Sequence, residues 1–144
     1  PMCQALDLAA QSVRTWIDQH PHSFPPVVLN VTDGEATDGE PLRYAQQLRS
    51  FATDDGEVLL FNVHLSSSEA PAVELPSAPG ELPRTDEYAE TLYQMSSTLP
   101  FSMRAAAEQE GYTVNLDTRG FVFNADPVAL VRFLEIGTRP SNLR

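Results

Sequence analysis

The sequence predicts an α/β fold in which a mostly parallel sheet is flanked by helices. Two strongly apolar segments, 27–32 and 58–63, have the composition of parallel strands that are covered on both faces. Residues 41–52, between them, carry apolar residues at helical spacing, and a strand–helix–strand unit of this length predicts a right-handed crossover. The chain of 144 residues has the size of one domain, so we expect a single domain over 1–144.

The first element is an amphipathic helix over residues 2–19. Its apolar residues recur every three or four positions, with polar residues between them: Met2, Leu6, Ala9, Val13, Trp16 and Ile17. We expect Trp16 to lie in the core and Cys3 to be a small core residue. The helix should end near His20, because the residue before a proline is pushed out of helical geometry and Pro21 follows.

The middle of the chain combines a helix, a strand and a long irregular segment. Pro41 suits the first turn of the second helix, and Asp54-Asp55-Gly56 is a turn that leads into the second strand. Residues 66–84 then contain three consecutive serines, four prolines and a glycine. This composition predicts an irregular Pro/Ser-rich insertion, with a short edge strand at 73–75.

The last part of the chain returns to alternating helices and strands. Thr85 can cap a third helix over about 86–97, and a fourth helix is expected at about 101–110. A short apolar strand follows at 120–124, and Asp126-Pro127 opens a final helix that ends at Gly137. In all, the sequence predicts about three strands and five helices.

Charge and composition exclude several functions. Twenty acidic residues, nine arginines and no lysine give a net charge of −11, which repels nucleic acids and anionic membranes. No apolar run approaches the ~18 residues of a membrane span. Cys3 is the only cysteine, so the chain has no internal disulfide. We therefore predict a cytoplasmic protein that binds neither nucleic acid nor membrane.

The candidate site is the acidic segment after the first strand. Asp33, Glu35, Asp38 and Glu40 gather there around two glycines. Ligands collect outside the carboxyl ends of parallel strands, and carboxylate oxygens suit hard divalent cations such as Mg²⁺, Mn²⁺ or Ca²⁺. An EF-hand loop is excluded, because the sixth position counted from Asp33 is Asp38 and not glycine. A solvated acidic turn without a metal is the alternative interpretation.

The segment 27–35, with the sequence VVLNVTDGE, resembles the strand and third metal loop of a von Willebrand factor type A (VWA) domain. Residues 2–19, 92–97 and 121–136 are similar to helices and a strand of that family in the same order. The resemblance implies a doubly wound fold with a metal-ion-dependent adhesion site. It also implies that Asp33 is a metal ligand and that an acidic side chain of a protein partner completes the coordination of the ion.

The chain departs from the VWA pattern at the rest of the metal site. The Asp-x-Ser-x-Ser signature of the family's first strand is absent, and the threonine of its second metal loop would precede Pro1. The chain thus resembles the carboxyl-terminal two thirds of such a domain. Metal binding is expected to be weak or absent in the isolated chain. The apolar strands would leave an uncovered edge, which predicts an amino-terminal segment of the same domain or a second copy in a homo-oligomer as partner.

The resemblance to a VWA domain implies that the chain is a non-catalytic, metal-dependent protein-binding module. Two other functions are possible. A Mg²⁺-dependent phosphohydrolase would use Asp33, Glu35 and Asp38, but no glycine-rich phosphate loop follows either of the first two strands. A scaffold fragment without a functional metal is the other possibility. His64 with the serines at 66–68 lacks the Gly-x-Ser-x-Gly context of a hydrolytic triad, so we expect a structural role for His64.

Overall fold

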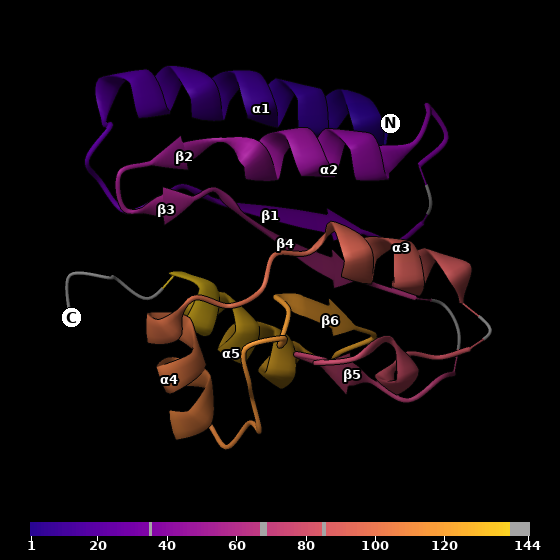
Figure 1. Cartoon of the computed structure of the whole chain (residues 1–144). Coiled ribbons are helices and arrows are strands. Elements are labelled where there is room, and N and C mark those ends of the chain that lie inside the picture. The colour runs from indigo at the N-terminus through magenta and orange to yellow at the C-terminus, as the bar shows by residue number, and fades with distance from the viewer. Residues whose placement is uncertain (35, 67–68, 85, 139–144) are drawn as a thin grey trace.

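The computed structural model describes residues 1–34, 36–66, 69–84 and 86–138 (Figure 1). In this part of the chain the main sheet has four strands in the order β1-β4-β6-β5. Their bounds are Val27–Thr32 (β1), Leu59–His64 (β4), Phe121–Phe123 (β6) and Val73–Glu74 (β5). β1, β4 and β6 are parallel, whereas β5 is antiparallel to β6. The expected α/β fold is therefore confirmed, with a mixed sheet.

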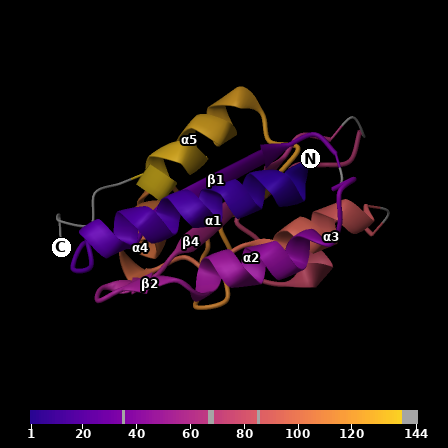
Figure 2. The same ribbon diagram turned by 90° about the horizontal axis from the view of Figure 1, so that it is seen from above.

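Helices cover both faces of this sheet (Figures 1 and 2). α1 (Met2–Gln19), α2 (Pro41–Ser50) and α3 (Glu87–Met95) share one core with the sheet. α4 (Phe101–Gln109) and α5 (Pro127–Thr138) share the other core. A short 3-10 helix, η1, spans Pro79–Glu81. Within the described residues, none of the helices has both the length and the apolar character needed to cross a bilayer.

β4 is the centre of the packing, and all six of its residues are buried. Its side chains alternate between the two cores: Leu60 packs below α1 to α3, whereas Phe61 and Val63 pack against α4 and α5. The Phe61 ring also lies directly on Gly120, where an added Cβ would come within 2.1 Å of the ring atom Cδ1. Only glycine fits at position 120 without displacing Phe61.

β1 is an edge strand of the sheet, and its residues are only partly buried or exposed. The main-chain groups of even-numbered residues point toward β4. The carbonyl of Pro26, just before β1, accepts from the Leu59 N–H, and the carbonyl of Thr32, at the end of β1, accepts from the Leu65 N–H. Because direction alternates along a strand, the N–H groups of Val27, Leu29 and Val31 point away from β4. No described residue accepts from them, and we call this row of outward groups the open edge of β1. One side of β1 thus has no neighbouring strand within the described ranges.

Most element bounds agree with the sequence prediction. The expected ranges of the first helix and the first strand match α1 and β1, and β5 is the expected edge strand. A two-stranded hairpin, β2 (Ala52–Thr53) and β3 (Gly56–Glu57), was not predicted, and α2 ends before it at Ser50. Strands of two residues are too short to show the alternation that marks a strand in a sequence.

Trp16 lies elsewhere than the sequence predicted, at the surface of α1. The placement of Trp16 in the core is wrong: it is 38% exposed and stacks on His20, with ring centroids 4.4 Å apart. Trp16 lies at the margin of the apolar stripe of α1, so it stacks on His20, the residue that follows the end of the helix, and not on the sheet. The expected cap Thr85 lies outside the described residues, and the described cap of α3 is Asp86.

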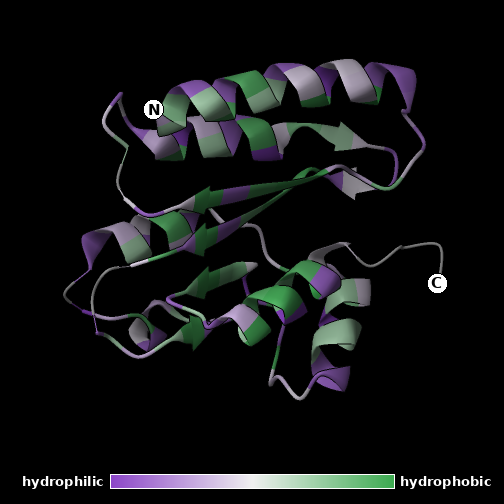
Figure 3. Cartoon of the chain, turned by 180° about the vertical axis from the view of Figure 1, so that it is seen from behind, coloured by the Kyte–Doolittle hydropathy of each residue, from purple (hydrophilic) through white to green (hydrophobic). Residues whose placement is uncertain are grey.

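Figure 3 shows the apolar residues concentrated along the sheet and the helix faces that meet it.

Candidate functional site

Asp33 follows β1 directly and lies at the carboxyl end of the parallel strands. The turn that holds it is closed by Thr32, whose Oγ1 accepts from the Gly34 N–H at 3.2 Å and lies 2.9 Å from the Gly34 carbonyl oxygen, to which it donates. Asp33 itself is exposed. Its carboxylate is therefore accessible to a ligand from outside the chain.

Asp38 has a different role from the one the acidic segment suggests. Its Oδ1 accepts from the Cys3 N–H at 3.0 Å, and its Oδ2 accepts from the Gln4 N–H at 2.9 Å. These are free donors of the first turn of α1, so Asp38 caps that helix from a distant loop. Desolvation acts to raise the pKa of the carboxyl group, but the hydrogen bonds from Gln4 and Cys3 outweigh it and hold the pKa below its usual value.

The described residues alone do not form a divalent-cation site. No group of three or more His, Cys, Asp or Glu side chains gathers around a common point in the described ranges. Glu35, the other carboxylate of the predicted phosphohydrolase, lies outside them. Mg²⁺ takes about six oxygen ligands, so a metal site at Asp33 would need most of its ligands from outside the described residues.

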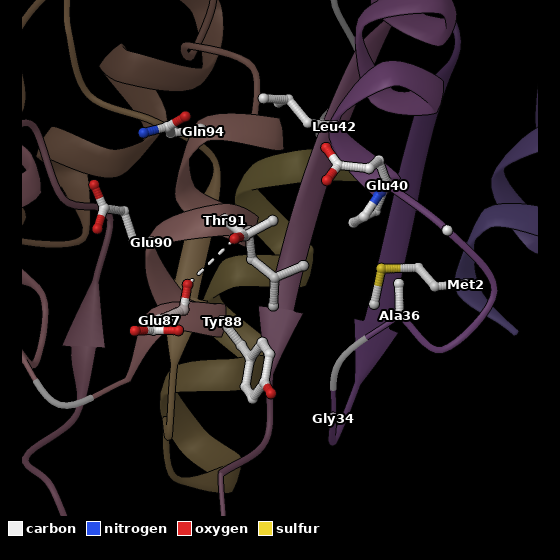
Figure 4. Close-up of a pocket in the computed structure, with 13 residues that line it drawn as sticks. Met2, Gly34, Ala36, Glu40, Leu42, Glu87, Tyr88, Glu90, Thr91 and Gln94 are labelled. Atoms are coloured by element: carbon white, nitrogen blue, oxygen red, sulfur yellow. Dashed lines mark hydrogen bonds between the residues drawn. The ribbon is translucent and has the colours of Figure 1, made fainter.

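A cavity of about 500 Å³ lies beside this loop, between the amino-terminal ends of α1 and α2 and the exposed side of α3 (Figure 4). Ala36 and Met2 line one side of it, and Tyr88 of α3 lies on the opposite side (Figure 4). Its acidic lining residues come from α3 and the start of α2: Glu40, Glu87 and Glu90. Three carboxylates around one cavity favour a cation or a basic side chain as its occupant.

His64 forms a buried pair that the sequence did not predict. Its Nε2 lies 3.3 Å from Oδ2 of Asp86, and the His64 side chain is 4% exposed. The other oxygen of Asp86 accepts from the Tyr88 and Ala89 N–H groups and caps α3. The pair therefore joins the end of β4 to the start of α3, which is a structural role for His64. Of the serines at 66–68 that follow His64, those at 67 and 68 lie outside the described residues.

Cys3 lies in the first turn of α1 and is buried, as the sequence predicted. Burial raises the pKa of its thiol, and the nearby Asp38 carboxylate raises it further. A thiol with a raised pKa holds little of the reactive thiolate form. Cys3 thus belongs to the core and not to a site of nucleophilic chemistry.

Comparison with known proteins gave no relative for this chain. No protein-family model, curated protein or solved structure matches it. The functional argument therefore depends on the geometry of the chain itself.

Proposed function

We propose that this chain is part of a VWA-like, metal-dependent protein-binding module in which Asp33 contributes one ligand to a Mg²⁺ ion, or to Mn²⁺ or Ca²⁺. The observation that carries the proposal is the position of Asp33. It is exposed, and it directly follows a parallel strand whose outer edge has no neighbour among the described residues. A further segment supplies the remaining metal ligands and pairs with the open edge of β1.

The open edge supports the pairing of such a strand. Natural edge strands are usually protected by charges, prolines or bulges, and β1, with the sequence VVLNVT, has none of these. Its N–H groups at Val27, Leu29 and Val31 are directed outward, and the Val31 side chain is 55% exposed. A parallel strand added here would end beside Asp33, because the carboxyl ends of parallel strands lie at the same edge of a sheet.

Binding is better supported than hydrolysis. The alternative phosphohydrolase would need Asp38 and Glu35 beside Asp33, but Asp38 caps α1 through both of its oxygens. In the proposed module an acidic side chain of a protein partner completes the coordination of the ion, and no group of this chain acts as a catalyst. The proposed partner segment is an amino-terminal part of the same domain or a second copy of the chain, in a cytoplasmic setting.

Metal binding by Asp33 is tested by adding Mn²⁺ to the isotope-labelled chain and following paramagnetic line broadening by NMR. We expect weak binding that broadens the amides around Asp33 and Gly34, since one protein carboxylate leaves most of the coordination to water. Asp33→Ala should remove this effect. Asp18→Ala, which removes another exposed carboxylate, from α1, should not.

The completed module is tested by native mass spectrometry of the protein as purified from its own cells, with and without EDTA. We expect a complex with a polypeptide carrying Asp-x-Ser-x-Ser, or with a second copy, that EDTA and Asp33→Ala both weaken. A monomer of 15.9 kDa that folds and binds no partner would contradict the proposal. Mg²⁺-dependent hydrolysis of a phosphate ester that Asp33→Ala abolishes would replace it with the phosphohydrolase.

A further inference from the structure

Two arginines from distant parts of the sequence meet at the carboxyl end of α3. Arg49 lies in the last turn of α2, and Arg119 precedes β6. Each donates from Nη1 to main-chain carbonyls at the end of α3: Arg49 to Gln94 and Met95 at 3.2 and 3.4 Å, and Arg119 to Tyr93, Gln94 and Ser96 at 3.2, 3.1 and 3.2 Å. Both guanidinium groups therefore share the Gln94 carbonyl and are direct neighbours.

Holding two like charges side by side has an electrostatic cost. Burial lowers the pKa of Arg49, and the charge of Arg119 lowers it further, against a smaller opposing effect of Glu57. Arg119 is also fixed in orientation, because its Cζ lies 4.6 Å from the centroid of the Tyr93 ring. A negative ligand between the two guanidinium groups would relieve this repulsion.

Both arginines retain donors for such a ligand. A guanidinium group carries five N–H donors, and all the bonds to α3 start from Nη1. Both side chains line a cavity of about 450 Å³. The cavity also offers uncharged hydrogen-bonding side chains: Gln46, Ser77, Gln94 and Thr98. Asp117 is its one acidic residue among the described lining residues.

The Ser77 hydroxyl is placed to add a further donor. Its Oγ lies 2.6 Å from Oγ1 of Thr118, and either oxygen can donate in that bond. Thr118 is fully buried, and its Oγ1 already accepts from the Asn115 N–H at 2.8 Å. When Thr118 donates to Ser77, the Ser77 proton is left to donate to a ligand in the cavity.

We propose that the cavity lined by Arg49 and Arg119, here called the two-arginine pocket, binds the phosphate group of a small phosphomonoester. Two fixed cations match the nearly two negative charges of a phosphomonoester at neutral pH. Its three terminal oxygens can accept from both arginines and from Ser77, whereas a carboxylate engages one guanidinium in two parallel bonds and leaves the other without a partner. The net charge of −11 disfavours a polyanion, so the ligand is a small molecule. The proposal is independent of the metal site at Asp33.

The probe is inorganic phosphate, titrated into the full chain at constant ionic strength and followed by NMR and calorimetry. We expect saturable binding with a Kd on the order of 1 mM or tighter, with the largest shifts at the Arg119, Ser77 and Gln94 amides. Glycerol phosphate should bind at least as tightly. Acetate over the same range should not saturate. Equal binding of acetate and phosphate, or no saturable binding of phosphate, would overturn the proposal.

Matched variants locate the binding in the two-arginine pocket. Arg49→Gln and Arg119→Gln should each weaken phosphate binding by about tenfold, since each loses a charge-assisted hydrogen bond. Arg43→Gln removes the same charge from an exposed position on the same helix and should leave the Kd within about twofold. If Arg43→Gln weakened binding as much, the proposal would fail.

A second variant guards against loss of folding, because Arg49 and Arg119 also hold the end of α3. Asp117→Asn removes the acidic lining residue and should tighten phosphate binding by about two- to fivefold. A partly unfolded protein cannot produce such a gain. An unchanged or weaker affinity in Asp117→Asn would place the phosphate elsewhere and would contradict the proposal.

Discussion

β1 and β4 are neighbouring strands with closely similar sequences and very different surroundings. VVLNVT in β1 pairs residue for residue with LLFNVH in β4, and the Nδ2 of Asn30 donates to Oδ1 of Asn62 at 2.9 Å across the pair. Val63 is 1% exposed, whereas its partner Val31 is 55% exposed. Nearly the same pattern is thus buried in one strand and half open in the other.

The difference comes from the number of neighbours. β4 lies between β1 and β6, and the N–H of Asn62 donates to the Gly120 carbonyl on the side away from β1. β1 has only β4. A nearly continuous run of apolar residues encodes a strand that is suited to burial on both faces, but the neighbours decide whether it is buried. β1 therefore has the sequence of a central strand at the position of an edge strand, which supports the proposed pairing at its open edge.

The largest effect is expected at Gly120, just before β6, where the Phe61 ring of β4 packs against the backbone. Gly120→Ala would place a Cβ within 2.1 Å of the Phe61 ring and should lower the free energy of unfolding by about 3 kcal/mol, measured by chemical denaturation. Gly80→Ala is the control, because nothing lies within 4 Å of a Cβ at that position. It should change stability by less than about 1 kcal/mol. Equal losses in the two variants would mean that β4 is not tightly packed.

The paired valines test the comparison between β1 and β4 directly. Val63→Ala should cost about 2 kcal/mol of unfolding free energy, because it removes two buried methyl groups from a closed core. Val31→Ala should cost less than about 0.5 kcal/mol in the isolated chain. A similar loss for both variants would show that the open edge of β1 is already covered in solution.

The smallest effect concerns the loop after β1 and depends on pH. The pKa of Asp38 is lower in the folded chain than its ordinary value of 3.8, so its contribution to stability is complete above that value. The contribution is lost as the pH falls through the lower folded pKa. Asp38→Asn should therefore be less stable than the native chain at pH 7, and the difference should shrink below pH 3.8 in thermal unfolding experiments. Asp33→Asn, which changes an exposed carboxylate, should show no comparable loss at pH 7.

Local patterns made the elements predictable, but not the contacts between distant residues. Proline boundaries and apolar spacing gave the ranges of α1 and β1, because both signals act within a few residues. The capping of α1 by Asp38 joins residues 34 and 35 positions apart, and no local pattern indicates it. For the same reason, the sequence assigned Asp38 to a possible metal site. The spacing of apolar residues likewise placed Trp16 in the core. This spacing shows which face of α1 is apolar, but not which residues at the margin of that face are buried.

The residues of the candidate sites and of the long-range pairs divide in the same way. The position of Asp33 directly after a strand could be predicted from the sequence, whereas its role as a metal ligand stays a prediction. The pairs His64 with Asp86 and Arg49 with Arg119 could not, since each joins elements that meet only in the folded chain. The unusual absence of lysine gave no indication that two of the nine arginines would meet at one helix end.

The open edge of β1 has no neighbour among the described residues, and the central claim is that it is also unpaired when the isolated chain is in solution. Amide hydrogen exchange measured by NMR on the monomer tests this claim most directly. We predict that the outward N–H groups of Leu29 and Val31 exchange rapidly, whereas the Asn62 N–H, bonded to Gly120 at 2.9 Å, is strongly protected. Protection of Leu29 and Val31 equal to that of Asn62 would contradict the claim, because another segment of the chain would then already occupy the edge.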